Sequence, residues 1–204
     1  MTRTLLAFAV VALAAIPASA GKYNKVLKVG DAAPQWKDLE GTDGAKHSLA
    51  DLKDREAVVV VFTCNSCPVA VGYEDRLLAF AEKHAGAKSG VEIVAINVNT
   101  IKEDALPEMK KHAEKKKFPF AYLYDPSQEI AKKFGATTTP EFFVLNRERR
   151  VVYMGALDDK LDPAEATVNY LIPALKGAMG AKIDFESETL PRGCKIRFSR
   201  KRDE

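Results

Sequence analysis

Two of the three cysteines in this 204-residue chain, Cys64 and Cys67, are separated by only two residues. A disulfide between them would close an unusually small ring, whereas a structural disulfide gains most by closing a long loop. The pair is therefore better suited to redox exchange or to metal binding than to cross-linking the fold. In an exchange, one thiolate attacks a substrate disulfide and the other cysteine displaces the product from the mixed disulfide. On this chemistry we expect Cys64 to be the nucleophile and Cys67 the resolving cysteine.

The sequence around the pair predicts a strand that leads directly into a helix. Residues 57–62 form a continuous, mostly β-branched run, which is typical of a strand buried on both faces. Helical spacing of apolar residues begins near residue 66 and continues to about residue 84. The free N–H groups and the dipole of a helix's first turn stabilise a thiolate. We expect Cys64 to be the more exposed of the two cysteines, with Cys67 one turn along the helix.

A Thr-Pro dipeptide, Thr139-Pro140, precedes another apolar stretch that predicts a strand, residues 141–145. A proline at the entrance to a strand can follow a cis peptide bond, which exposes the preceding backbone groups. Such exposed groups can pair with an extended peptide by strand addition. We therefore expect a cis bond here, with Thr139 and Pro140 binding an extended substrate.

The rest of the chain alternates between predicted strands and helices. Strands separated by helices indicate a parallel sheet, and a closing hairpin adds an antiparallel edge. We expect one α/β domain with a central mixed sheet flanked by helices on both faces. The other expected strands are 91–98, 120–124 and 151–154. The other expected helices are a short one at 49–52 after a turn at 41–44, then 102–117, a short one ending near 134, and one from Asp162-Pro163 to about 177.

The first twenty residues have the pattern of a signal peptide. Arg3 precedes an apolar run over residues 5–16, and Ala18-Ser19-Ala20 ends in the small residues that signal peptidases accept. The apolar run is shorter than the ~20 residues that span a bilayer, which favours a cleaved signal over a membrane anchor. We expect a signal peptide at 1–20, a domain at 21–180 and a C-terminal extension at 181–204. The protein would then be exported to the periplasm, without stable membrane insertion.

The composition excludes several classes of function. Hydrophobic residues make up 47% and charged residues 29% of the chain, which is usual for a folded globular protein. The 31 basic residues are nearly balanced by 28 acidic ones, whereas a dedicated nucleic-acid binder is usually more basic. The most charged predicted helix, 102–117, mixes both signs, and its acidic residues are expected on a solvated face. Those residues are Glu103, Asp104, Glu108 and Glu114.

Four segments make the chain resemble the thioredoxin-like superfamily, and more closely its exported redoxin branch of TlpA- and ResA-like proteins. They are Val29–Pro34, Gly44–Leu49, Phe62–Pro68 and Thr138–Pro140. The resemblance covers roughly residues 26–175 and implies a thioredoxin-like fold. It implies a disulfide oxidoreductase without a bound cofactor, whose partners are protein thiols or disulfides and an upstream electron donor. It also implies catalytic roles for Cys64 and Cys67 and a cis Pro140 beside them. It leaves the number of chains in the assembly open.

The chain departs from the family's pattern at several positions. Thr63 occupies the position where thioredoxins have a tryptophan. Val58 lies near the position of the buried acidic residue of thioredoxins. TlpA-like proteins often have a glutamate just after the pair, where this chain has Val69 and Ala70. The sequence therefore does not identify the group that accepts a proton from the resolving thiol.

A thiol peroxidase with an antioxidant role is an alternative, because the flanking segments also resemble the AhpC/TSA group. Members of that group carry a threonine three residues before the peroxide-reacting cysteine and a proline four residues further back. Val61 and Ala57 occupy these places. Without the hydroxyl to orient peroxide, we expect disulfide reduction to be much faster than peroxide reduction.

A Cu(I)- or Zn(II)-binding module similar to a metallochaperone is a second alternative, since two thiolates can bind either metal. Exported copper-delivery proteins of a related fold use a CxxxC pair and a distant histidine, and this chain is one residue short of that spacing. His47, His84 and His112 are scattered along the sequence, and we interpret them as surface residues. The sequence thus predicts no metal site.

The third cysteine, Cys194, lies in the C-terminal extension beyond the last predicted helix. It could be a third redox thiol that resolves Cys64 or links two chains. The interpretation that we favour from the sequence is a residue without a redox role, held by local packing.

Overall fold

The computed structural model describes residues 20–199. The predicted signal peptide, except for its last residue, lies outside these residues. Among residues 20–199, no helix has both the length and the apolar composition needed to cross a bilayer.

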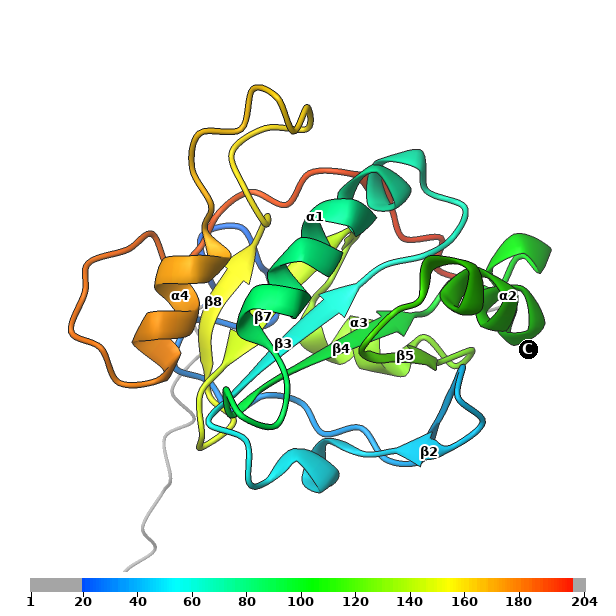
Figure 1. Cartoon of the computed structure of the whole chain (residues 1–204), viewed down its shortest axis with the longest axis horizontal. Helices are drawn as coiled ribbons and strands as arrows, with labels where there is room; N and C mark the ends of the chain where they lie inside the picture. The colour runs from blue at the N-terminus through cyan, green and yellow to red at the C-terminus, as the bar shows by residue number, and fades with distance from the viewer. Residues whose placement is uncertain (1–19, 200–204) are drawn as a thin grey trace, which may run out of the picture.

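Three parallel strands form the centre of the sheet: β3 (Ala57–Phe62), β4 (Val91–Asn97) and β5 (Ala121–Tyr124). Two further strands, β7 (Glu141–Leu145) and β8 (Val151–Gly155), continue it as the predicted antiparallel hairpin (Figure 1). Every residue of β3 is buried, as its β-branched run predicts. The strands predicted from the sequence are therefore confirmed, with boundaries shifted by one residue at most.

A short hairpin of β1 (Leu39–Gly41) and β2 (Lys46–His47) extends the sheet beyond β5. In the described part of the chain the strand order is β2-β1-β5-β4-β3-β7-β8. The predicted turn at 41–44 joins β1 to β2, and the short predicted helix is present as a 3₁₀ turn, η1 (Leu49–Leu52). The sequence did not predict these two strands, because they are too short to show a period.

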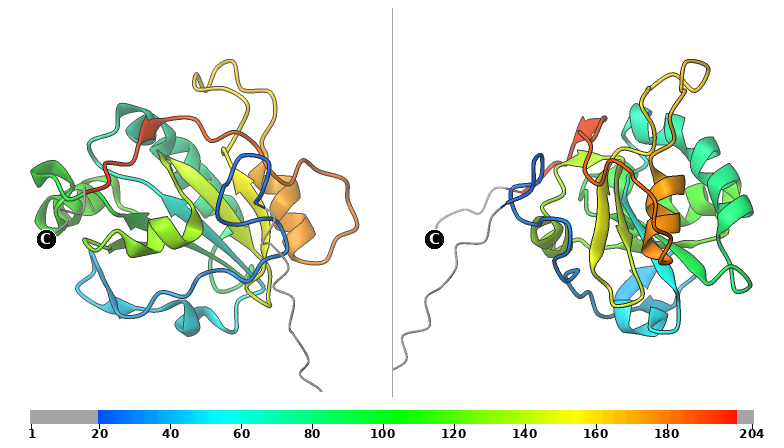
Figure 2. Two further views of the ribbon diagram at one scale, coloured as in Figure 1. Left: turned by 180° about the vertical axis from the view of Figure 1, so that it is seen from behind. Right: turned by 90° about the vertical axis from the view of Figure 1, so that its left-hand side faces the viewer.

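Helices cover both faces of the sheet, as expected. On one face, α1 (Pro68–His84), α2 (Leu106–Lys116) and α4 (Leu171–Ala178) pack in a single hydrophobic core. On the other face, α3 (Glu129–Phe134) packs in a second core (Figure 2). The sheet thus separates two apolar cores and carries the site at the carboxyl ends of its central strands.

Two helix predictions are wrong in their extent. The helix expected at 102–117 is divided into a 3₁₀ turn, η2 (Lys102–Asp104), and α2, because Ala105 between them is extended. The last helix begins at residue 171 rather than at Asp162-Pro163. Tertiary contacts hold the preceding segment as a loop: Tyr73 and Arg76 of α1 both donate hydrogen bonds to the carbonyl oxygen of Lys160, at 2.9 and 3.0 Å.

The chain beyond α4 crosses the end of the sheet and reaches the beginning of α1 (Figures 1 and 2). Its short strand β9 (Cys194–Lys195) pairs antiparallel with β6 (Thr138–Thr139). Ile196 next to it is buried in the core on the α3 face. The C-terminal extension is therefore packed into the domain at the site where the cysteines lie.

Candidate active site

The Cys-x-x-Cys pair occupies the loop between β3 and α1, as predicted. Cys67 caps the helix: its sulfur accepts a hydrogen bond from the N–H of Ala70 at 3.3 Å. Pro68 fills the first helical position, where a missing N–H costs nothing. The helix N-terminus therefore acts directly on the Cys67 sulfur, while Cys64 lies one turn before the helix.

The expectation that Cys64 is the more exposed cysteine is wrong. Cys64 and Cys67 are each only 2% exposed. They form a buried cluster with Ala70, against which Val69 and Cys194 also pack. The covering of Cys64 comes from segments distant in the sequence, which the local pattern could not reveal.

Thr139 lies against both sulfur atoms of the pair. Its hydroxyl oxygen is 3.5 Å from the Cys64 sulfur, and its carbonyl oxygen is 3.2 Å from the Cys67 sulfur. The Thr139–Pro140 peptide bond is cis, as the sequence predicts. The structure thus brings together the four residues that the sequence assigns to the site, although they come from two segments more than 70 residues apart.

Cys67 forms a disulfide with Cys194, while Cys64 keeps a free thiol. The Cα atoms of the two bonded residues are 6.0 Å apart, within the ordinary range for a disulfide. The interpretation of Cys194 as a residue held by local packing alone is therefore wrong. No local signal could pair these residues, because 127 positions separate them in the sequence.

Asn65 and Ser66, which lie between the two cysteines, form hydrogen bonds to the turn η2. The Asn65 side chain donates to the carbonyl oxygen of Glu103 at 3.0 Å. Ser66 donates to the carboxylate of Asp104 through its backbone N–H at 2.9 Å and through its hydroxyl at 2.6 Å. The expectation that Asp104 lies on a solvated face is wrong, since Asp104 is 0% exposed. Asp104 is instead the main anchor of the cysteine loop.

Two asparagines at the end of β4 complete this anchor. Asn99 donates to the Asp104 carboxylate at 3.1 Å, and Asn97 donates to its backbone carbonyl at 2.9 Å. Both asparagines are buried. Polar residues at the end of a buried apolar strand are the one sequence signal that could have predicted this cluster.

Replacing Asp104 with alanine is expected to lower the free energy of unfolding by about 3 kcal/mol, because several buried donors lose their acceptor. The matched variant Ser66→Ala removes one side-chain donor and is expected to cost about 1 kcal/mol. Urea unfolding of both reduced variants measures the difference. An Asp104→Ala protein as stable as Ser66→Ala would contradict the anchoring role.

Tyr122 is hydrogen-bonded to the loop that carries Cys64 and Cys67. Its hydroxyl donates to the side-chain oxygen of Asn65 at 3.0 Å. Burial, assisted by the neighbouring Cys64 and Asp104 side chains, raises the pKa of Tyr122 well above its ordinary value. The hydroxyl therefore stays protonated and remains a donor to the loop.

Glu141 follows Pro140 directly and is also buried. Its carboxylate accepts hydrogen bonds from the N–H groups of Thr137 and Thr138, at 2.9 and 3.1 Å. Burial raises the pKa of Glu141 to about 7, although these two hydrogen bonds and the charge of Lys195 act in the opposite direction. The carboxyl group thus orders the segment that carries Thr139 and titrates near neutral pH.

The three histidines are half-buried and each has a neighbour of its own. His47 pairs with Asp43, His84 contacts the ring of Phe80, and His112 lies 2.5 Å from a carboxylate oxygen of Glu74. Within residues 20–199, no three His, Cys, Asp or Glu side chains gather in a way that could hold a metal ion.

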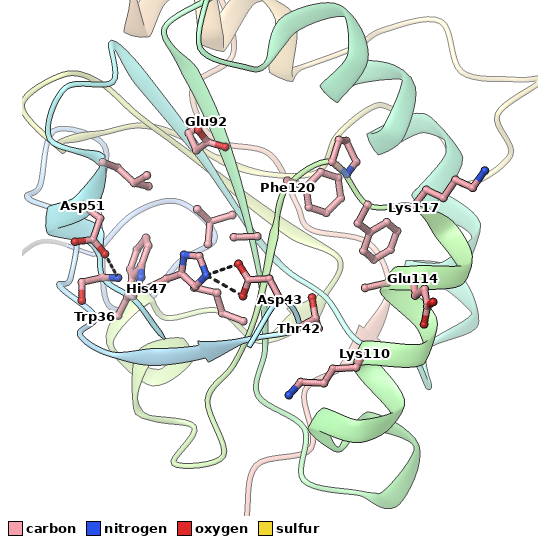
Figure 3. Close-up of a pocket in the computed structure, with 18 residues that line it drawn as sticks. Trp36, Thr42, Asp43, His47, Asp51, Glu92, Lys110, Glu114, Lys117 and Phe120 are labelled. Atoms are coloured by element: carbon pink, nitrogen blue, oxygen red, sulfur yellow. Dashed lines mark hydrogen bonds and ion pairs between the residues drawn. The ribbon is translucent and has the colours of Figure 1, made fainter. Parts of the chain in front are cut away.

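A cavity of about 830 Å³ lies between the β1–β2 hairpin and α2 (Figure 3). Trp36 and Phe120 contribute apolar walls, and charged residues such as Lys110 and Glu114 line its opening. None of the three cysteines lines it. This cavity is therefore separate from the sulfur cluster.

The sequence model of the Redoxin family matches residues 28–172, a range that contains Cys64, Cys67, Thr139 and Pro140. This chain belongs to the Redoxin family. Cys194 lies outside the matched range. The resemblance stated from the sequence is thus confirmed at the level of the family.

Similar proteins agree with this assignment. The redoxin is 27% identical over 158 residues to the thiol-disulfide oxidoreductase ResA of Oceanobacillus iheyensis, covering 74% of this chain and 76% of that protein. An uncharacterized conserved protein of Geobacillus kaustophilus has a similar structure, with a TM-score of 0.74 and 32% identity over 88% of this chain and 96% of its own. The thioredoxin domain of a thiol-disulfide oxidoreductase from Bacteroides vulgatus matches with a TM-score of 0.53 and 21% identity, covering 63% of this chain and 88% of its own. The redoxin therefore has the thioredoxin-like fold that the sequence predicts.

Proposed function

We propose that this redoxin is an exported thiol–disulfide oxidoreductase that exchanges disulfides through Cys64 and Cys67. The observation that carries the proposal is the position of Thr139, whose two oxygen atoms lie against both sulfurs. One residue beside a cis-proline thereby contacts the proposed nucleophile and the proposed resolving sulfur at the same time. The activity named for the ResA relative supports the same chemistry.

In the reduced enzyme, the Cys64 thiolate would attack one sulfur of a substrate disulfide and release the other as a thiolate. The Thr139 hydroxyl, 3.5 Å away, can donate a hydrogen bond to the Cys64 sulfur. The Cys67 thiolate, supported by the N–H of Ala70, would then attack the Cys64 sulfur and release the second substrate thiolate. Two electrons pass from the enzyme's thiols to the substrate, and the enzyme keeps a disulfide.

We expect the substrates to be proteins with disulfides in an extended segment, which would take the place of β9 on the edge of β6 next to the sulfurs. Repeated turnover needs an upstream dithiol donor that returns two electrons to the enzyme. The N-terminal pattern of residues 1–20 supports export, with the redoxin domain at 21–180 and the extension at 181–204 in the mature protein. The exchange itself needs no cofactor, since sulfur atoms carry the electrons.

We expect the reduced wild-type protein to reduce glutathione disulfide at least about tenfold faster than it reduces hydrogen peroxide. The place where peroxidases of the AhpC/TSA group carry their threonine hydroxyl is occupied by Val61, which is 0% exposed and packed in the core. Thiol loss measured against each oxidant at equal concentration gives the two rates.

Faster consumption of peroxide than of the disulfide, dependent on Cys64, would replace the proposal by the peroxidase alternative. Stoichiometric copper or zinc after purification under reducing conditions, lost in Cys67→Ser, would favour the metal-binding alternative. Each result contradicts disulfide exchange as the main activity.

A further inference from the structure

The C-terminal extension places a third sulfur atom at the proposed site. Cys194 lies opposite Thr139 in the register of β6 and β9, and its sulfur is bonded to that of Cys67. Thr139 therefore contacts the sulfurs of Cys64 and Cys67 and pairs with the residue that carries the third. The strand β9 occupies the same backbone edge that a substrate peptide would use.

Contacts other than the disulfide hold Cys194 in place. The N–H of Ile196 donates to the carbonyl oxygen of Thr137 at 2.9 Å, and the Ile196 side chain is buried. The Gln128 side chain donates to the carbonyl oxygen of Arg197 at 2.9 Å and accepts from the N–H of Ser199 at 2.7 Å. These contacts are expected to keep the segment near Cys67 in the reduced protein also.

Gly193 allows the close approach of β9 to β6. A Cβ atom at this position would overlap the carbonyl carbon and oxygen of Thr139. The residue before Cys194 must therefore be glycine for the strand to lie this close. The requirement indicates a segment shaped to approach the residue before the cis-proline.

We infer that Cys194 is a third catalytic cysteine, which forms a disulfide with Cys67 after each exchange. The oxidised enzyme then has a Cys67–Cys194 disulfide and a free Cys64 thiol. The inference rests on the proposed function, because it concerns the fate of the disulfide that the exchange leaves on the enzyme. The arrangement seen in the structure is this oxidised form.

The step balances without any added reagent. The Cys194 thiolate attacks the Cys67 sulfur of the Cys64–Cys67 disulfide, the bond between those two sulfurs breaks, and Cys64 leaves as a thiolate. One disulfide is exchanged for another, so no electrons enter or leave the protein. The upstream dithiol later reduces the Cys67–Cys194 disulfide and becomes a disulfide itself.

This relay has two consequences for the site. The ring through Cys67 and Cys194 is much larger than the ring between Cys64 and Cys67, which moves the disulfide out of the tight loop. At the same time β9 covers the peptide-pairing edge of β6. The disulfide ties β9 to this edge, so the oxidised enzyme would yield the edge to a substrate peptide less readily than the reduced enzyme, in which noncovalent contacts alone hold β9.

Mapping of the disulfide formed by the wild-type protein tests the inference. The fully reduced protein is oxidised with one equivalent of glutathione disulfide, quenched in acid, alkylated with N-ethylmaleimide and digested with trypsin. Cys64 and Cys67 fall in the tryptic peptide 56–76, and Cys194 falls in the peptide 193–195. We expect these two peptides to be cross-linked, with the alkyl group on Cys64.

The other outcomes are distinct. Peptide 56–76 with an internal disulfide, together with alkylated Cys194, would overturn the relay and leave the proposed function standing. A dimer linked through Cys194 on a non-reducing gel would also overturn the relay. If glutathione disulfide oxidises none of the three cysteines, the proposed function itself fails.

Two variants serve as matched controls. In Cys194→Ser the internal disulfide of peptide 56–76 is expected, because the third thiol is absent. Gly193→Ala keeps all three thiols but obstructs the approach of β9, so the ratio of cross-linked to internal disulfide should fall about tenfold. An unchanged ratio in Gly193→Ala would contradict the role of strand pairing in bringing Cys194 to Cys67.

Discussion

Replacing Cys64 with serine should lower the rate at which the reduced protein reduces glutathione disulfide by about 10³-fold or more. A hydroxyl group is not ionised at neutral pH and is a far weaker nucleophile than a thiolate. The loss should be this large because Cys64 is the proposed attacking residue, with the Thr139 hydroxyl oxygen 3.5 Å from its sulfur. Stopped-flow measurement of glutathione release from equal amounts of both proteins gives the ratio.

The companion variant Cys67→Ser separates attack from resolution. Cys64 can still attack, so this variant should accumulate a mixed disulfide with glutathione, detected as an added glutathione in the intact mass. Cys64→Ser should not gain glutathione at that rate. Activity of Cys64→Ser within tenfold of wild type would instead assign the attack to Cys67 or Cys194.

The parts of the fold that the sequence predicted are those with strong local signals. The short, mostly β-branched apolar run of β3 is typical of a strand buried on both faces, and cysteines directly after such a strand lie at its carboxyl end. The proline before β7 lies at the same end because β7 runs antiparallel to β3, which brings the start of β7 beside the end of β3. The local signals predicted each of these elements, and the family resemblance implied that the cis-proline lies beside Cys64 and Cys67.

The parts that could not be predicted depend on partners far away in the sequence. Asp104 looked like one acidic residue among several on a charged helix, and only its contacts with Ser66 and Asn99 show that it anchors the loop. Cys194 offered no periodic pattern, since β9 has only two residues and is positioned by β6. In both cases tertiary contacts decide the role of a residue whose local sequence is uninformative.

The glutamate beside the cis-proline connects the geometry of the site to pH. The Glu141 carboxylate fixes the backbone of Thr137 and Thr138, immediately before the residue that contacts both sulfurs. Its pKa is about 7 in the folded protein because of burial, compared with 4.5 for an ordinary glutamate. Between these two values the folded state holds a proton that the unfolded state has released. The stabilisation from this group is therefore fully present below about pH 4.5 and is lost as the pH rises through about 7.

Replacing Glu141 with glutamine should remove this dependence. The amide oxygen can still accept the two backbone hydrogen bonds, but the side chain cannot ionise. The free energy of unfolding of Glu141→Gln, relative to wild type, should rise by about 3 kcal/mol between pH 4.5 and pH 8. Urea unfolding across this range measures the difference, in which the other titrating groups cancel.

The control is Glu148→Gln, which removes a glutamate from the exposed turn between β7 and β8. Its stability relative to wild type should vary by less than about 0.5 kcal/mol over the same range, because no desolvated charge is removed. A difference between Glu141→Gln and wild type that stays constant with pH would show that Glu141 does not carry a buried, titrating proton. A difference that does change with pH would mean that ionisation of this buried carboxyl group, which orders the segment before Thr139, destabilises the folded state.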